Sequence, residues 1–151
     1  MALSDELKQT LDIDVSSEAN ELISHLDNLD QEIKTAVDSI PQDQRKLVTG
    51  HDSLGYYAQR YGFQVVGAII PSITTQAEVS AADLANLKHL IEEYGVQAIF
   101  TELGTNPTVA QAIGAETGVS VVEITTHLLP EDGSYFTMIR DLTQAITDAL
   151  K

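Results

Sequence analysis

The 151-residue chain contains no cysteine, which excludes disulfide bonds, thiol catalysis and metal sites with thiolate ligands. Basic residues are also few: 8 lysines and arginines stand against 23 aspartates and glutamates, giving a formal net charge of −15. Nucleic acids and anionic membrane surfaces bind proteins through basic patches, so neither is expected as a partner. The charge favours a cation as the ligand.

Long apolar runs and signal sequences are absent as well. No stretch approaches the roughly 18 apolar residues of a membrane span, and the opening residues MALSDELKQT have neither the basic nor the apolar segment of a signal peptide. Three enzyme signatures are missing: the Gly-x-Ser-x-Gly elbow, the Walker loop and the Gly-x-Gly-x-x-Gly turn. The sequence therefore predicts no signal peptide in this chain and disfavours a catalytic function.

The length and the 43% hydrophobic content indicate one domain with a sizeable core and an N-terminal appendage. Apolar residues recur at spacings of three and four from residue 16 or 17 to residue 38, which predicts an amphipathic helix. We expect its apolar face to be buried against the rest of the chain or a second copy; this face comprises Leu22, Ile23, Leu26, Leu29 and Ile33. The predicted organisation is a helical segment at residues 1–40 and an α/β lobe at residues 41–151.

Beyond Pro41, β-rich runs alternate with helical patterns, which is typical of a parallel sheet built from βα units. The predicted strands are residues 46–49, 63–70, 97–101 and 119–125, and residues 71–79 are predicted to form a loop. The run at 63–70 is almost entirely apolar, so we expect it to be covered on both faces. With right-handed crossovers, the fold class is α/β, a three-layer sandwich with a four-stranded parallel sheet preceded by a long N-terminal helix.

Local signals set the helix boundaries. Ser53 is expected to cap a helix that ends at Gly62, Ser80 and Asp83 resemble a capping box, and Asn106 with Pro107 opens the next helix. Three tyrosines, Tyr56, Tyr57 and Tyr61, are expected to pack in the core and at its rim, while His25 and His89 are expected to be solvated.

Three potential metal ligands follow three of the predicted strands: His51, Glu102 and His127. Because the carboxyl ends of parallel strands share one edge of the sheet, we expect His51 and His127 to lie close enough to share one ion. Two imidazoles and a carboxylate suit Zn²⁺ or a similar divalent ion. Glu102 has two open roles, either as a ligand or as a hydrogen-bond acceptor that orients a ligating imidazole. The ordinary alternatives are a hydrogen-bonded loop histidine at 51 and an exposed one at 127.

Several motifs in the second region resemble a known family. They are RKLVTGHDSLGYYAQRYG at residues 45–62, SAADL at 80–84, AIFTE at 98–102 and GSYF at 133–136. Together with shorter matches from about Leu26 onward, they cover roughly four fifths of the chain. The segment is similar to the C-terminal lobe of the zinc- and manganese-specific solute-binding proteins of bacterial ABC transporters, the metal-binding adhesin lipoproteins.

The resemblance implies a function and a ligand set. Family members hold one metal ion between two α/β lobes, with two ligands from each lobe, and the matching histidine here is His51. Where the family usually has an aspartate after the last strand, this chain has His127. Imidazole suits zinc and hard oxygen ligands suit manganese, so this difference favours zinc as the bound ion, with manganese as the alternative.

The first lobe of the family is not found in this chain, because only about forty residues precede the His51 segment. We therefore expect a truncated metal-binding lobe, with a divalent metal ion, an ABC permease and a homodimer as its predicted partners. The family's location is extracytoplasmic, either periplasmic or membrane-anchored. Two other functions remain open: a metal-free docking module and, less favoured, a mononuclear metal hydrolase in which His51, His127 and Glu102 would leave one metal position free.

Overall fold

The computed structural model describes residues 2–70, 80–103 and 105–151, so the predicted loop at 71–79 lies outside the described residues. The chain divides into two compact units, Met1–Thr35 and Ala36–Lys151, which are described separately. The functional boundary at residue 40 stays a prediction. Among the described residues, no helix combines the length and apolar character needed to cross a membrane.

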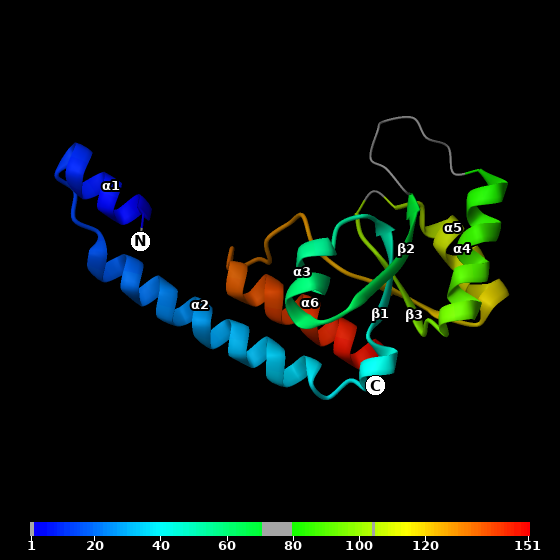
Figure 1. The fold of residues 1–151 in the computed structure, drawn as a ribbon. Helices are drawn as coiled ribbons and strands as arrows, with labels where there is room; N and C mark the ends of the chain where they lie inside the picture. The colour runs from blue at the N-terminus through cyan, green and yellow to red at the C-terminus, as the bar shows by residue number, and fades with distance from the viewer. Residues whose placement is uncertain (1, 71–79, 104) are drawn as a thin grey trace. The chain divides into compact units, whose positions relative to one another are not determined.

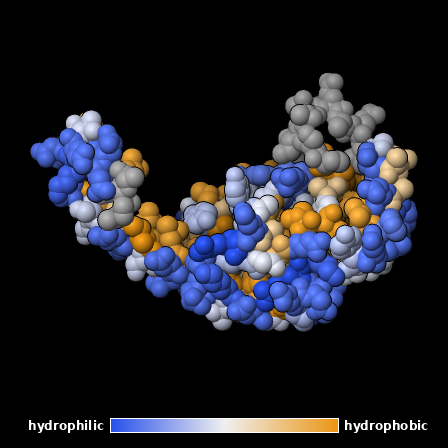
Figure 2. Space-filling model, viewed as in Figure 1, coloured by the Kyte–Doolittle hydropathy of each residue, from blue (hydrophilic) through white to orange (hydrophobic). Residues whose placement is uncertain are grey.

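The first unit is helical. It contains α1, Ala2–Leu11, and most of α2, Ser16–Val37, which matches the helix predicted from the apolar spacing. On α2, Leu29 and Ile33 are buried, whereas Leu22, Ile23 and Leu26 are 51%, 38% and 39% exposed. In the single chain, the first half of this apolar face is therefore exposed, and its burial against a second copy stays a prediction. Figure 2 shows hydrophobic residues gathered along that half.

The second unit is built on a parallel sheet. Its strands are β1, Lys46–His51; β2, Gln64–Ile70; β3, Ala98–Thr101; and β4, Ser120–Glu123. They pair in the order β2-β1-β3-β4, and every pairing is parallel, which confirms the predicted fold class. The chain passes outward from β1 to β2 and then returns to the other side of β1 to form β3. The strand order therefore reverses between β1 and β3, where open α/β sheets form a crevice for ligands.

Helices cover both faces of this sheet. One layer contains α4, Ala81–Tyr94, which packs on β2, and α5, Pro107–Thr117, which packs on β3 and β4 (Figure 1). The other contains α3, Gly55–Tyr61, and α6, Tyr135–Ala149, joined by a 2.9 Å hydrogen bond between the Tyr57 and Thr143 hydroxyls. A short 3₁₀ helix, Gln42–Gln44, precedes β1. The predicted three layers are thus present.

One buried cluster forms where α4 and α5 meet the sheet. Its fully or nearly fully buried members are aliphatic: Val48, Ile69, Leu87, Ile91, Val96, Ile99, Ala110 and Ile113. The predicted boundary signals act as expected on this layer. Ser80 and Asp83 form a reciprocal capping box, and the Asn106 side chain accepts from the Thr108 N–H. These caps use the backbone N–H groups that a helix start leaves without intrahelical partners.

Three expectations about exposure have different outcomes. The prediction that residues 63–70 form a strand covered on both faces is wrong, because β2 lies at the edge of the sheet and Val65 is 37% exposed. Tyr56 is also misplaced by the sequence argument, since it is 91% exposed, whereas the Tyr57 and Tyr61 rings pack at 4.8 Å between centroids. His25 and His89 are exposed, as expected.

Candidate metal site

The sheet brings the first two site residues together. The β1–β3 register pairs Val48 with Ile99 and Thr49 with Phe100, and continuing it two residues sets His51 beside Glu102. Both strands run in the same direction, so both side chains lie at the carboxyl edge where the strand order reverses. Both are also buried: His51 is 8% exposed and Glu102 is 3% exposed.

The third residue reaches the same edge from the loop after β4. The Ile124 N–H donates to the Thr101 carbonyl at 2.8 Å, which ties the start of this loop to the end of β3. Three residues later, the exposed His127 lies with its Nε2 atom 3.0 Å from Nε2 of His51, and the two rings are 5.1 Å apart between centroids. The expected proximity of the two histidines is therefore found in the structure.

This spacing suits chelation. With Zn–N distances of about 2.0–2.1 Å and tetrahedral angles, two ligating nitrogens lie about 3.3 Å apart. The two Nε2 atoms are already within a few tenths of an ångström of that separation. In the metal-free chain the two atoms share a hydrogen bond whose donor depends on the tautomers of the rings, and an ion bound by both nitrogens would replace it.

Glu102 contacts the other nitrogen of His51. Its Oε2 atom is 3.3 Å from His51 Nδ1, on the side of the ring away from His127. Its Oε1 atom accepts a hydrogen bond from the Ser53 hydroxyl. Among the described residues, Oε2 has no hydrogen bond of good geometry, although it lies within ion-pair distance of the imidazole. Of the two roles left open by the sequence, this position fits orientation of His51 better than direct ligation.

The backbone of Gly50 lies directly under this carboxylate. A Cβ atom on Gly50 would come within 2.7 Å of Glu102 Oε2 and 2.0 Å of Thr105 Oγ1. These separations are shorter than van der Waals contact, so glycine is required for the observed packing. The hydroxyls of Thr49 and Thr105 are buried here, and within the described ranges neither has a hydrogen-bond partner.

The number of ligands is limited. Within residues 2–70, 80–103 and 105–151, no group of three or more histidines, aspartates and glutamates is arranged to hold a metal ion. The described lobe therefore offers a pair of imidazole nitrogens, and a four-coordinate ion needs further ligands from elsewhere.

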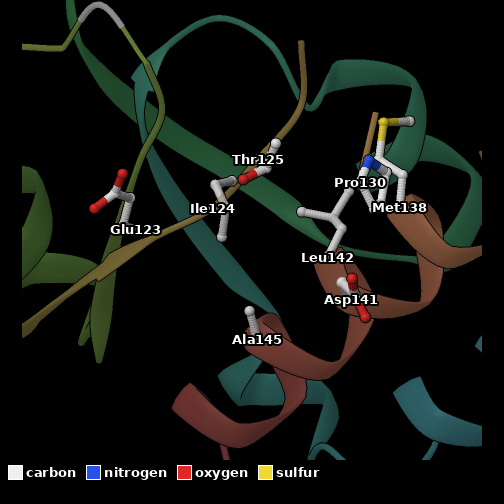
Figure 3. A pocket seen from close by; sticks show the side chains of 8 residues that line it. All are labelled: Glu123, Ile124, Thr125, Pro130, Met138, Asp141, Leu142 and Ala145. Carbon is white, nitrogen blue, oxygen red and sulfur yellow. The ribbon is translucent and has the colours of Figure 1, made fainter. Parts of the chain in front are cut away.

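A separate pocket of about 220 Å³ lies between the end of β4 and α6 (Figure 3). The loop that carries His127 contributes Thr125 and Pro130 to its wall, but no described histidine lines it. Figure 3 shows the Glu123 carboxylate on the strand side, well apart from the Asp141 carboxylate on the helix. The rest of the lining is mainly apolar, from Ile124, Pro130, Met138, Leu142 and Ala145. The metal-binding geometry thus belongs to the histidine pair and not to this pocket.

Sequence reasoning missed part of the site. Ser53 was expected to cap α3, but that helix begins at Gly55, and its N-cap residue Leu54 offers no side-chain hydrogen bond. The contribution of Gly50 was also missed, because a glycine after a strand looks like a turn residue. No signal in the sequence separates these roles, since the partner residues 102 and 105 lie about fifty positions away.

Comparison with known proteins identifies the family. Residues 6–149 match the family model described as ZnuA, zinc-uptake complex component A, periplasmic. The chain belongs to this family. The match spans both the helical segment and the α/β lobe, and so confirms the resemblance inferred from the motifs.

Individual relatives bind metals according to their names. The chain is 39% identical over 77 residues to the zinc-binding protein TroA of Treponema pallidum, covering 51% of this chain and 24% of the relative. It is 29% identical over 143 residues to the manganese-binding lipoprotein MntA of Bacillus subtilis, covering 88% and 46%. A solved structure of TroA superposes with a TM-score of 0.76 at 27% identity, covering 98% of this chain and 59% of that one. The chain thus spans less than half the length of these two curated relatives.

Proposed function

We propose that this chain is the metal-binding lobe of a zinc receptor of an ABC transporter, with manganese as the alternative ion. The observation that carries the proposal is the 3.0 Å separation of the His51 and His127 Nε2 atoms at the ligand-binding edge of the sheet. The ion is cargo, captured reversibly and released, and the chain is not proposed to be an enzyme. A net charge of −15 supports attraction of a divalent cation over distance.

Zinc is favoured by the donor types. Both direct ligands in the proposal are imidazoles, which bind zinc well, whereas manganese prefers carboxylate and other oxygen ligands. Glu102 acts as an outer partner in this scheme, on the Nδ1 side of His51, and not as a third ligand. Because protons and Zn²⁺ compete for the Nε2 lone pairs of the two imidazoles, we expect the affinity for Zn²⁺ to decrease as the pH falls.

The remaining ligands and partners are part of the same proposal. The receptor would work outside the cytoplasm with an ABC permease, and the other lobe of the receptor would complete the coordination shell. In the isolated chain, a second copy offers the same two imidazoles, so a zinc-linked homodimer is the alternative way to reach four ligands. The exposed residues Leu22, Ile23 and Leu26 of α2 support contact with such a partner.

Calorimetric titration with Zn²⁺ tests the proposal, with sedimentation analysis to count the chains per ion. His51→Ala and His127→Ala should each weaken binding by more than the roughly 10–100-fold that follows loss of an outer partner. His89→Ala is the matched control, since this histidine is exposed on α4 and lies 3.8 Å from Glu93. Equal affinity in the wild type and in both site variants would place the ion elsewhere. A folded wild-type chain that binds no metal would support the docking-module alternative.

A further inference from the structure

Ser53 uses its hydroxyl in an unexpected way. Serine just before a helix ordinarily accepts a hydrogen bond from the first turn, and this stabilises the helix start. Here α3 begins without a side-chain cap, and the Ser53 hydroxyl donates to Oε1 of Glu102, the residue that follows the neighbouring strand β3. The serine thus links the segment after β1 to the residue after β3, across the point where the strand order reverses.

Glu102 depends on this hydrogen bond. Its side chain is fully buried, at 0% exposure, and a buried carboxylate is stable only when its oxygens are held by hydrogen bonds or positive partners. Ser53 is the hydrogen-bond donor that the described residues provide to Oε1. On the other side, Oε2 is confined between the Gly50 backbone and His51 Nδ1. The carboxylate is therefore fixed in rotation by Ser53 at one oxygen and by packing at the other.

We propose that Ser53 is a positioning residue for metal capture, acting through Glu102 on His51. By holding Oε1, Ser53 keeps Oε2 where the carboxylate stabilises the proton on His51 Nδ1. The proton at Nδ1 leaves the lone pair of Nε2 directed toward His127, as required to bind an ion there. This inference rests on the proposed function, because the preferred tautomer matters only if Nε2 is a metal ligand.

The tautomer can be measured without metal. Long-range ¹H–¹⁵N NMR of the metal-free chain reports which nitrogen of His51 carries the proton, and calorimetry measures Zn²⁺ affinity in the same samples. The variants are Ser53→Ala, which removes the hydroxyl, and Ser53→Thr, which retains it. Ser120→Ala is the control, because this serine donates from β4 to the Gln97 carbonyl at the opposite end of the sheet.

We expect the wild type and Ser53→Thr to show the proton on Nδ1. Ser53→Ala should give a mixture of tautomers and an affinity for Zn²⁺ lower by about 10–100-fold, and Ser120→Ala should change neither. Ser53→Ala with an unchanged tautomer and unchanged affinity would overturn the proposal. A wild-type chain that binds no Zn²⁺ would overturn the proposed function instead, while the tautomer would still show whether Ser53 acts on His51.

A double-mutant cycle separates positioning from loss of stability. Glu102→Gln should weaken Zn²⁺ binding, and Ser53→Ala added to it should cost no further affinity if both act on His51 through one interaction. Independent, multiplicative losses in the double variant would contradict the proposal even if every variant is folded. If Ser53→Ala alone does not fold, Ser53→Cys, whose thiol is a weaker donor on a side chain of similar shape, takes its place, and an unchanged His51 tautomer and Zn²⁺ affinity in that variant would overturn the proposal.

Discussion

Gly50→Ala is the substitution that most directly tests the packing of the site. The new Cβ would lie 2.0 Å from Thr105 Oγ1, 3.0 Å from Thr105 Cβ and 2.7 Å from Glu102 Oε2. Rotation of the Thr105 side chain relieves the first contact but not the second, so the loop or the threonine backbone must also move. The third contact pushes the carboxylate away from its place beside His51. The substitution should therefore affect both stability and metal binding.

The cost in stability follows from overpacking. Inserting a methyl group into a well-packed site typically costs about 1–3 kcal/mol. For a chain of this size, that corresponds to a decrease of about 2–12 °C in the midpoint of thermal unfolding. Gly114→Ala is a matched control in α5, where a Cβ would meet Val121 Cγ2 at 2.8 Å on the face of the sheet that α4 and α5 cover. It should lower stability but leave Zn²⁺ affinity unchanged.

A second substitution separates the two effects of Gly50→Ala. Adding Thr105→Ala removes the 2.0 Å contact and should recover part of the stability, but the 2.7 Å contact with Glu102 remains. Zn²⁺ affinity should therefore stay low in the double variant. Thermal unfolding followed by circular dichroism and Zn²⁺ titration measure the two quantities. A Gly50→Ala chain with the stability and the Zn²⁺ affinity of the wild type would refute the reasoning.

Four further substitutions test the fold and its pH dependence. Burial raises the pKa of the Tyr57 phenol from 10.0 to about 12. The stability that its protonated form contributes is therefore fully present below pH 10 and is lost as the pH rises toward 12, a decline of about 2–3 kcal/mol. Tyr57→Phe should flatten this decline when urea unfolding is measured between pH 9 and 12. Phe100→Ala, at a fully buried position in β3, should cost about 3–5 kcal/mol in the same assay, whereas Tyr56→Ala should cost little. Ser80→Ala removes the capping box with Asp83 and should lower the free energy of unfolding by about 0.5–2 kcal/mol. A loss outside the range given for Phe100→Ala would contradict the assignment of the core, and one outside the range for Ser80→Ala would contradict the assignment of the cap.

Much of the fold could be predicted because its signals are local. The capping residues Ser80 and Asn106 act within one turn of their helices, and the β-rich runs alternate with helices as βα units require. The prediction that strand-end residues meet also held for His51 and His127, since parallel strands align their carboxyl ends whatever their order in the sheet. The family motifs supported only His51 of this pair, since the family usually has an aspartate where this chain has His127.

The errors concern features set by long-range packing. The apolar run in β2 looks like a central strand, but the strand order places it at the edge, and no local pattern encodes that order. The same limit hid the contact of Ser53 with Glu102, which joins residues 49 positions apart. Tyr56 is exposed because it lies on the outer side of the short helix α3, whose buried residue is Ala58. Burial here depends on tertiary contacts rather than on residue type.

The central claim is that His51 and His127 bind one ion together. Long-range ¹H–¹⁵N NMR during titration with Zn²⁺ tests it most directly, because a nitrogen that binds zinc changes its chemical shift and loses its proton. We predict that Nε2 of His51 and Nε2 of His127 change together and saturate at the same ratio of zinc to protein, while the His89 ring is unaffected. If Zn²⁺ alters His89 first, or alters only one member of the His51–His127 pair, the proposed site is contradicted.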